Sequence, residues 1–268
     1  MLSAKSNVHF IVNPVSGSGG ASFDLIGQYM AEATCKTTLH LTKVSHSATD
    51  CVQDALASNP DLIVAYGGDG TVMEVANCLH GHDIPLAIVA GGTANVVAHE
   101  LNIPVNTKDA LDFIFNGDHE ETWIDAGRIA DEHFLLRFSV GWEAELSQRP
   151  STEDKSKWGS LAYTKAALQA FNDLDPVTYK ITLDDDTVEE IIGINCSICN
   201  MGNTGIYGIN IGSGIFPDDG LLNILILQNK NIQAMLDLAQ NVLASSFELN
   251  LEENLPHFKA KKLEILPS

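Results

Sequence analysis

The stretch AYGGDGTVMEVAN, residues 65–77, decides the predicted fold. It begins in an apolar run, residues 62–66, that is typical of a buried strand, and it continues into a helix-like pattern over residues 71–79. The glycines allow positive φ angles and a close approach of the backbone to a ligand. Free N–H groups at a helix start, together with the helix dipole, form an anion-binding site. We therefore predict a strand–loop–helix unit that binds phosphate, in which Asp69 could hold a phosphate-bound Mg²⁺ and Thr71 could cap the helix.

Two further loops repeat this arrangement. Gly91-Gly92-Thr93 follows the apolar run 86–89, and Asn13-Pro14-Val15-Ser16-Gly17 follows the apolar run 8–12. The carboxyl ends of parallel strands lie at one edge of an open α/β sheet, where ligands bind. Each loop alone could be a tight turn that serves packing only, but three such loops at one edge favour a binding site.

The pattern of elements changes after about residue 123. Before this point, strand-like and helix-like segments alternate, which is typical of a layered α/β domain. After it, consecutive strand-like segments favour an antiparallel sheet or sandwich. These segments are 133–140, 177–184, 188–198, 206–212 and 221–227, with helices near 157–172 and 231–244. We therefore predict an N-terminal α/β nucleotide-binding domain, residues 1–125, followed by a mainly antiparallel β-sandwich domain for the substrate, residues 126–268.

Composition excludes several classes of protein. The formal net charge of −20 argues against nucleic acid as a partner, since phosphate contacts require clustered Lys and Arg. No apolar stretch approaches the roughly 18 residues of a membrane span. The N-terminus is typical of a first strand and not of a signal peptide, so a cytoplasmic location is expected. The 5 cysteines do not suggest a disulfide framework, and Cys196 and Cys199 are expected to be buried structural residues.

The three loops and several later motifs resemble the diacylglycerol kinase catalytic family, in particular its small bacterial lipid kinases, and are similar to sphingosine and ceramide kinases. The resemblance covers nearly the whole chain. Its motifs here are Asn13-Pro14-x-Ser16-Gly17, Gly67-Gly68-Asp69-Gly70-Thr71-x-x-Glu74-Val75-x-Asn77, Gly92-Thr93-x-Asn95, Asp125-x-Gly127, Ser139-Val140-Gly141-Trp142-Glu143-Ala144 and Phe216-Pro217-Asp218-Asp219-Gly220-Leu221.

The resemblance also implies a role for individual positions. Asp69 and Asp125 would be catalytic. Mg²⁺ would be held by the carboxylate of Asp219 and by the backbone carbonyls of Phe216 and Leu221. The nucleotide, ATP, would be bound by Asn13, Ser16, Thr42, Gly67, Gly68, Asp69, Gly70, Thr71, Glu74, Asn77, Thr93 and Asn95.

The sequence departs from the family pattern at three places. The third motif usually continues with an aspartate, where this chain has Val96, and Cys78 replaces the glycine that often follows Asn77. Relatives also carry an Asp-Gly-Glu motif near the C-terminus, whose glutamate is the proposed general base. No Asp-Gly-Glu occurs among the 268 residues, and the motif would begin at about Ser268. Either the chain continues beyond this residue or the protein lacks the base.

The resemblance implies an ATP- and Mg²⁺-dependent lipid kinase that phosphorylates a hydroxyl of diacylglycerol or a related lipid alcohol. A NAD kinase shares the Gly-Gly-Asp-Gly loop, but the Asn-Glu dipeptide that such enzymes pair with it does not occur in this sequence. A catalytically silent nucleotide- or lipid-binding protein is the third interpretation, favoured if the base is lacking. Residues 149–158, which include Arg149 and Trp158, could touch a membrane surface transiently, and the apolar strand 221–227 could pair in a homodimer.

Overall fold

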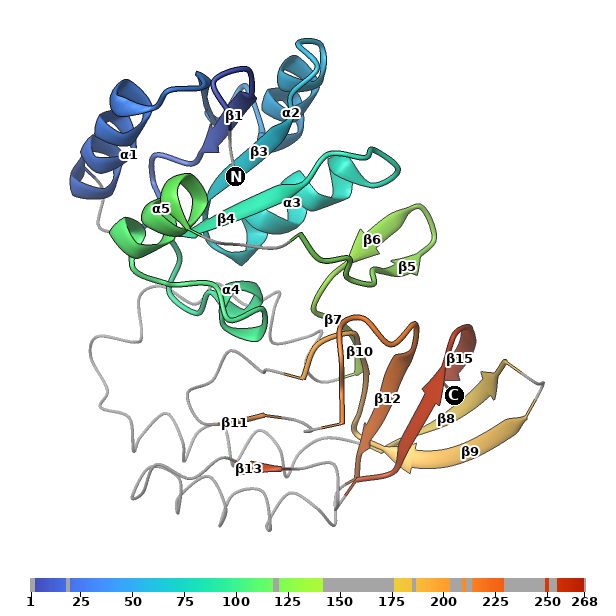
Figure 1. Ribbon diagram of the computed structural model, residues 1–268. Helices are drawn as coiled ribbons and strands as arrows, with labels where there is room; N and C mark the ends of the chain where they lie inside the picture. The colour runs from blue at the N-terminus through green and yellow to red at the C-terminus, as the bar shows by residue number, and fades with distance from the viewer. Residues whose placement is uncertain are drawn as a thin grey trace. The chain divides into compact units, whose positions relative to one another are not determined.

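The computed structural model describes residues 3–17, 20–117, 121–141, 176–184, 187–202, 209–210, 214–228, 249–250 and 255–267 (Figure 1). The chain forms two compact units. The first contains Met1–Ile124 and Arg128–Leu135, and the second contains Asp125–Gly127 and Leu136–Ser268. Within these described ranges, no helix is both long enough and apolar enough to cross a membrane. The expected fold class, an α/β domain followed by an antiparallel β-rich domain, is confirmed.

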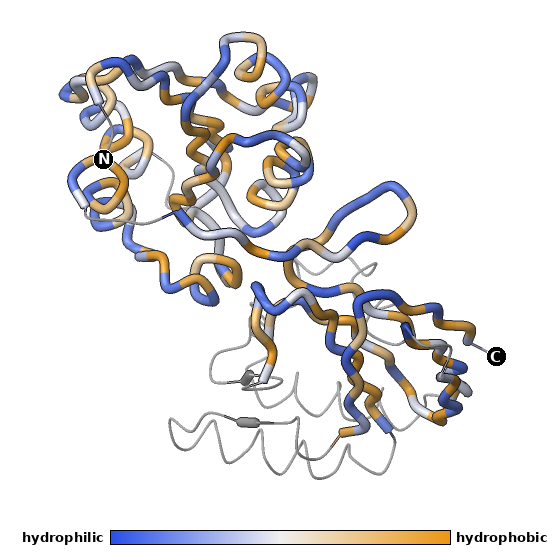
Figure 2. Tube along the Cα trace, turned by 45° about the vertical axis from the view of Figure 1, so that its right-hand side comes forward, coloured by the Kyte–Doolittle hydropathy of each residue, from blue (hydrophilic) through white to orange (hydrophobic). Residues whose placement is uncertain are grey.

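The first unit is built on a parallel sheet. Its strands are β1 Asn7–Val12, β2 Lys36–Leu41, β3 Leu62–Gly67 and β4 Leu86–Ala90, in the order β2-β1-β3-β4. Every residue of the inner strand β3 is buried, which explains why its sequence, LIVAYG, is nearly all apolar. In Figure 2 the strands form the apolar centre of this unit. Because the strands are parallel, the loops that follow them meet at one edge of the sheet.

Helices cover both faces of this sheet (Figure 1). They are α1 Gly20–Glu32, α2 Ala48–Leu56, α3 Asp69–Leu79, α4 Val96–Glu100 and α5 Thr107–Asn116. Successive residues of a strand point to opposite faces. Phe10 and Tyr66 therefore pack against α1 and α5, whereas Ile11 and Ala65 pack against α2 and α3. This three-layer arrangement leaves the edge at the strand ends for the loops.

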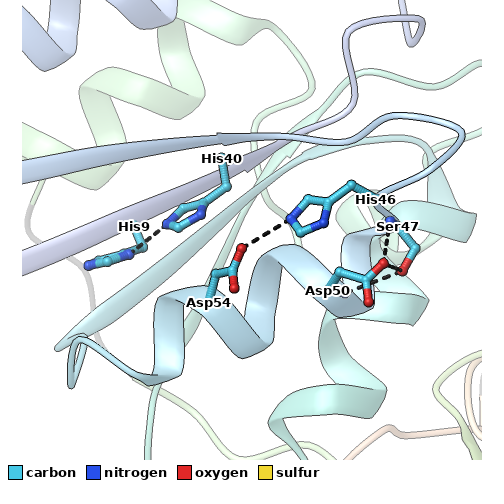
Figure 3. A network of polar contacts seen from close by, with 6 residues as sticks. All are labelled: His9, His40, His46, Ser47, Asp50 and Asp54. Carbon is cyan, nitrogen blue, oxygen red and sulfur yellow. Dashed lines mark hydrogen bonds and ion pairs between the residues drawn. The ribbon is translucent and has the colours of Figure 1, made fainter.

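A histidine pair, buried His9 and half-buried His40, joins β1 to β2 (Figure 3). Asn7 Nδ2 donates to the carbonyl oxygens of Ser58 (2.9 Å) and Asn59 (3.3 Å), so Asn7 Oδ1 is the acceptor that faces His9 Nε2 at 3.2 Å. His9 Nδ1 then accepts the hydrogen bond from His40 Nε2 at 2.9 Å. His9 is 1% exposed, and burial lowers the pKa of both imidazoles. Burial and these contacts therefore favour the neutral form of both imidazole rings.

Helix α2 begins with a capping box. Ser47 Oγ accepts from the backbone N–H of Asp50 at 3.2 Å, and the Asp50 carboxylate accepts from the N–H of Ser47 at 2.8 Å. These hydrogen bonds lower the pKa of Asp50. His46 Nε2 lies 3.1 Å from a carboxylate oxygen of Asp54 (Figure 3). The two contacts attach the loop after β2 to the helix.

The second unit consists mainly of antiparallel strands. They are β7 Arg137–Gly141, β8 Val177–Leu183, β9 Val188–Gly193, β10 Asn195–Cys199, β11 Ile209–Asn210, β12 Leu222–Leu227, β13 Leu249–Asn250, β14 His257–Ala260 and β15 Leu263–Pro267. One sheet has the order β14-β12-β10-β7 and another β15-β8-β9, and a parallel pair joins β11 to β13. The Tyr179 hydroxyl of β8 donates to the carbonyl oxygen of Val140 in β7 at 3.1 Å, which connects the two larger sheets.

Cys196 and Cys199 lie in β10 and are buried free thiols, as expected. Burial raises the pKa of Cys196 to about 12, so this thiol stays protonated. The helices expected near 157–172 and 231–244 lie outside the described residues.

Three expected elements were wrong in their bounds. The strand predicted over 188–198 is divided between β9 and β10. The strand predicted over 133–140 is divided between β6 Glu132–Phe134 and β7, and β6 pairs with β5 Gly127–Ile129 in a hairpin. The chain returns to the first unit at this hairpin, because β6 packs against α3. The helix predicted from residue 71 begins at Asp69, a residue that the helix dipole favours in a first turn.

Candidate functional site

The loops of the first unit are neighbours at the carboxyl edge of the sheet. The first residue after β2, β1 and β4 extends the pairing of each strand by one bond. Thr42 N–H donates to the oxygen of Val12 (2.9 Å), Asn13 N–H to that of Tyr66 (3.0 Å) and Gly91 N–H to that of Gly67 (2.8 Å). The strand order changes direction between β1 and β3. Open α/β sheets bind ligands at such a switch point. The predicted loops after β1, β3 and β4 therefore lie where this fold binds ligands.

The glycine loop leads directly into α3. The N-cap is Gly68, without a side-chain cap, and the first bond inside the helix runs from the N–H of Val72 to the oxygen of Gly68 at 3.1 Å. The N–H groups of residues 69–71 thus have no acceptor inside the helix. Thr71 does not cap the helix as expected: it is buried in the first turn, where its Oγ1 accepts from Asn13 Nδ2 at 3.1 Å. This bond ties the loop after β1 to the glycine loop.

The glycine loop touches the turn after β4. A Cβ on Gly92 would lie 2.6 Å from the Cα of Gly68, so the two backbones are in van der Waals contact. Asn95 closes the turn, since its Oδ1 accepts from Gly92 N–H (2.8 Å) and its Nδ2 donates to Gly92 O (3.0 Å). Asn95 also has a left-handed backbone, with φ 48°, which asparagine tolerates better than most residues. Asparagine therefore gives this turn a hydrogen-bond acceptor, a hydrogen-bond donor and a left-handed backbone at one position.

Asp69 connects the same two loops. Its Oδ1 accepts from the N–H of Val97 at 3.2 Å, at the start of α4, whose own N-cap residue Asn95 is turned back to Gly92. Asp69 Oδ2 has no hydrogen bond to any described residue. Val96, at the position of the family's aspartate, is buried. Asp69 is half-buried, and one oxygen of its carboxylate has no hydrogen bond to a described residue.

The loop after β1 rests on Tyr66. The Tyr66 hydroxyl donates to the oxygen of Ser16 at 3.3 Å, and Asn13 Oδ1 accepts from the N–H of Val15 at 3.2 Å. Gly17 has φ +70°, and a Cβ there would lie 2.9 Å from both the Tyr66 hydroxyl and the Gly91 oxygen. Tyr66 was not among the predicted site residues, because a buried tyrosine in an apolar strand has no sequence signal of its own.

The other predicted nucleotide residues are spread more widely. Thr93 and Glu74 are exposed, and Thr42 is half-buried at the end of β2. Asn77, two turns into α3, has its Oδ1 3.1 Å from His133 Nδ1, and the His133 ring stacks on His80 at 3.8 Å. Burial, and then His80, lower the pKa of His133. The structure therefore uses Asn77 to hold the β5–β6 hairpin, a contact that no sequence motif indicated.

In the second unit, Asp125 holds the turn that contains Asp219. The Asp125 carboxylate accepts from Gly220 N–H at 2.6 Å, and its own N–H donates to Pro217 O at 2.5 Å. Its carbonyl oxygen accepts from Asn200 Nδ2 at 2.7 Å. These bonds hold the turn, and the catalytic role expected for Asp125 stays a prediction.

The predicted metal ligands Phe216, Asp219 and Leu221 belong to this turn. Asp219 Oδ1 accepts from Leu221 N–H at 3.0 Å, and Asp219 Oδ2 lies 3.8 Å from Lys259 Nζ. An ammonium group beside the carboxylate opposes a divalent cation there, so this group of residues does not fit Mg²⁺ well. Across the parts of the chain that the structure describes, no cluster of three or more His, Cys, Asp or Glu side chains is arranged to hold a metal. The segments 142–158, with Glu143 and Arg149, lie outside the described residues.

Two family models match the chain. Residues 7–128 match the diacylglycerol kinase catalytic domain, and residues 137–266 match the YegS C-terminal NAD kinase beta sandwich-like domain. The first match contains all three loops of the first unit. The second contains the Asp219 turn and the antiparallel sheets.

Individual relatives agree with these matches. A diacylglycerol kinase of Mycobacterium tuberculosis is 31% identical over 204 residues, which cover 72% of this chain and 63% of the relative. An uncharacterised protein of Synechocystis is 28% identical over 286 residues, which cover 100% of this chain and 64% of the relative. The chain thus spans less than two thirds of the length of these two proteins. The crystal structure of a diacylglycerol kinase from Bacillus anthracis has 31% identity and a TM-score of 0.75, and the match covers 98% of this chain and 86% of that chain. With both of its domains matched and this relative aligned over most of its length, the chain belongs to the diacylglycerol kinase family of lipid kinases.

Proposed function

We propose that the protein is an ATP- and Mg²⁺-dependent kinase that phosphorylates a hydroxyl of diacylglycerol or a related lipid alcohol. The observation that carries this proposal is the contact between the glycine loop and the Gly92 turn at the switch point of the sheet. Phosphoryl transfer requires mainly positioning and neutralisation of charge. A loop of backbone donors, held by two other loops, meets the first requirement.

The N-terminal turn of α3 would bind the phosphates. The N–H groups of residues 69–71 have no partner inside the helix, and α3 has 11 residues, so its dipole adds a partial positive charge at the same point. Asn13 supports this turn by its bond to Thr71. Thr93 is exposed on the adjacent turn, where its hydroxyl can donate to a phosphate oxygen.

Asp69 would hold the Mg²⁺ that accompanies ATP, through the carboxylate oxygen that is not bonded to Val97. When bound, Mg²⁺ would neutralise charge on the phosphates. The bond to Val97 fixes the carboxylate relative to the Gly92 turn.

The acceptor class rests on the names of relatives. Several of them are named diacylglycerol kinase or lipid kinase, and the description of the second domain's model also mentions NAD kinase. The proposal commits to a lipid alcohol, and NAD is the alternative acceptor that the experiment must include.

The test is transfer of labelled γ-phosphate from ATP in the presence of Mg²⁺. The acceptors are diacylglycerol in mixed micelles, ceramide in mixed micelles and NAD in solution. The variant is Asp69→Ala, and the matched control is Asp24→Ala, which removes an exposed carboxylate on α1.

Label in a lipid that is lost in Asp69→Ala and retained in Asp24→Ala would support the proposal. Label in NAD alone would replace the lipid acceptor. The absence of transfer to all three acceptors, with ATP binding intact, would contradict the kinase proposal for this chain and favour a nucleotide- or lipid-binding role.

A further inference from the structure

The turn of residues 214–221 in the second unit is satisfied by groups of the protein itself. Two of its backbone groups, Pro217 O and Gly220 N–H, bind Asp125. Gly220 has φ +72°, and no atom lies within 4 Å of an added Cβ, so glycine is needed there for its backbone conformation and not for space. Asp219 closes the turn through its bond to Leu221 N–H. The conformation therefore does not depend on a bound ion to supply these bonds.

Lys259 reaches this turn from β14. Its Nζ donates to the oxygen of Gly214 at 2.6 Å and lies 3.8 Å from Asp219 Oδ2. The side chains of Lys259 and Asp219 are 36% and 24% exposed, so both are partly shielded from water. The bond to Gly214 fixes the ammonium, since a lysine side chain otherwise has many rotamers.

Within the described part of the second unit, Lys259 is the cation placed beside the Asp219 carboxylate. Asp125 and Asp219 both bind the turn, and Asp218 lies in it. The nearby Lys261 and Lys262 contribute their backbone N–H groups to a different carboxylate, that of Asp184, at 2.8 Å and 2.5 Å. Without Lys259, the turn would present three acidic side chains and backbone oxygens, which is the type of donor set that divalent cations prefer.

A divalent cation at Asp219 would be close to the lysine. Mg²⁺ binds carboxylate oxygen at about 2.1 Å, so with Lys259 at 3.8 Å the two cations would be separated by at most about 6 Å. This separation is shorter than the Debye length of about 8 Å at physiological ionic strength, so salt screens the repulsion only partly. The Lys259 ammonium beside Asp219 therefore disfavours the binding of a divalent cation to the same carboxylate.

We propose that the Lys259 ammonium supplies the positive charge at Asp219 in place of a divalent cation, so that the turn is closed in the metal-free protein. This inference concerns the second unit only and does not depend on the proposed kinase reaction. It differs from the expectation that Asp219, Phe216 and Leu221 hold Mg²⁺. Any Mg²⁺ that arrives with ATP is a separate ion.

The experiment measures binding of Mn²⁺ alone to the nucleotide-free 268-residue chain, by the electron paramagnetic resonance signal of free Mn²⁺. Four variants are compared with the wild type: Asp219→Asn, Lys259→Met, the double variant, and Lys261→Met as the matched control. Lys259→Met keeps the apolar stem of the side chain and removes its charge. Hydrogen exchange of the Gly220 and Leu221 amides is measured in EDTA and in Mg²⁺.

We expect the same Mn²⁺ binding for the wild type, Asp219→Asn and Lys261→Met. Lys259→Met gains at least about tenfold in affinity for one site, since repulsion by the ammonium is removed, and the double variant loses this gain. The Gly220 and Leu221 amides are protected in EDTA in the wild type. If instead the wild type loses a Mn²⁺ site on Asp219→Asn, or the amides become protected only when Mg²⁺ is added, the proposal is overturned. The Mn²⁺ binding and the amide protection of the wild type test the proposal even if Lys259→Met does not fold.

Discussion

The contact between the glycine loop and the Gly92 turn can be tested by one methyl group. In Gly92→Ala the added Cβ would lie 2.6 Å from the backbone Cα of Gly68 and 2.8 Å from Asn95 Oδ1. Carbon atoms in good contact are about 3.5–4.0 Å apart, so the two loops must separate by about 1 Å. The backbone of Gly68 cannot rotate out of the way as a flexible side chain could. We therefore expect this substitution to disturb both stability and nucleotide binding.

The magnitude follows from the crowding and from the bonds beside it. Overpacking by one methyl group costs about 1–3 kcal/mol, and displacement of Asn95 would weaken hydrogen bonds worth about 1 kcal/mol each. A matched control is Gly27→Ala, on the exposed side of α1, where an added Cβ meets no atom within 4 Å. Alanine is favoured over glycine in a helix by about 0.5–1 kcal/mol. The two variants should therefore differ in stability by about 2–4 kcal/mol, with opposite signs relative to the wild type.

Two measurements check this expectation. Urea unfolding followed by circular dichroism reports the free energy of unfolding, and titration with a fluorescent ATP analogue reports nucleotide affinity. Gly27→Ala should be slightly stabilised and should bind the analogue like the wild type, whereas Gly92→Ala should lose in both measurements. If Gly92→Ala were as stable as Gly27→Ala and bound the analogue normally, the two loops would not be in contact, and the site built on them would be refuted.

Two further predictions concern the first unit. Asn95→Ala loses both bonds to Gly92 and places alanine at φ 48°, whereas Asn95→Gly loses only the bonds. The alanine variant should therefore have a free energy of unfolding in urea about 1–2 kcal/mol lower than that of the glycine variant. Equal stabilities would show that the left-handed backbone at residue 95 does not limit the choice of residue. Burial lowers the pKa of His9 and of His40 below the usual 6.5, so the unfolded chain binds more protons than the folded chain at acid pH. The contribution of the neutral pair to folding stability is therefore fully present above about pH 6.5 and is lost as the pH falls below this value. Imidazole titrations by NMR should give pKa values below 6.5 for both rings, with stability less dependent on acid pH in His9→Gln; a His9 value at or above 6.5 would rule out the neutral pair.

Much of the first unit could be predicted from local sequence, because its determinants are local. The run LIVAYG is apolar at nearly every position, as a strand buried on both faces must be, and the glycines after it mark the start of a helix. The alternation of strands and helices then requires a parallel sheet, which places the following loops at one edge. The position of the three loops in the structure follows from this topology alone. The bounds of α3 and β6 were less accurate, since the ends of elements depend on packing.

Contacts between distant residues could not be predicted in the same way. His133 meets Asn77 across 56 residues, Gly220 meets Asp125 across 95 residues, and Asp69 meets Val97 across 28 residues. Each depends on the direction of a side chain after the strands and helices have packed. Asp125 shows the consequence, since its motif gave no indication of the bonds by which it holds the turn of residues 214–221.

The sequence by itself determined the α/β layer, the order of the two domains and the presence of a glycine loop at a helix start, because backbone conformation and apolar periodicity act over a few residues. Only the tertiary structure decided which groups each loop residue meets: Thr71 bonds to Asn13 and does not cap its helix, and Lys259 lies beside Asp219, where a metal ion was expected. These partners come from other strands, and their positions depend on strand register and side-chain packing over the whole unit, which no local pattern specifies.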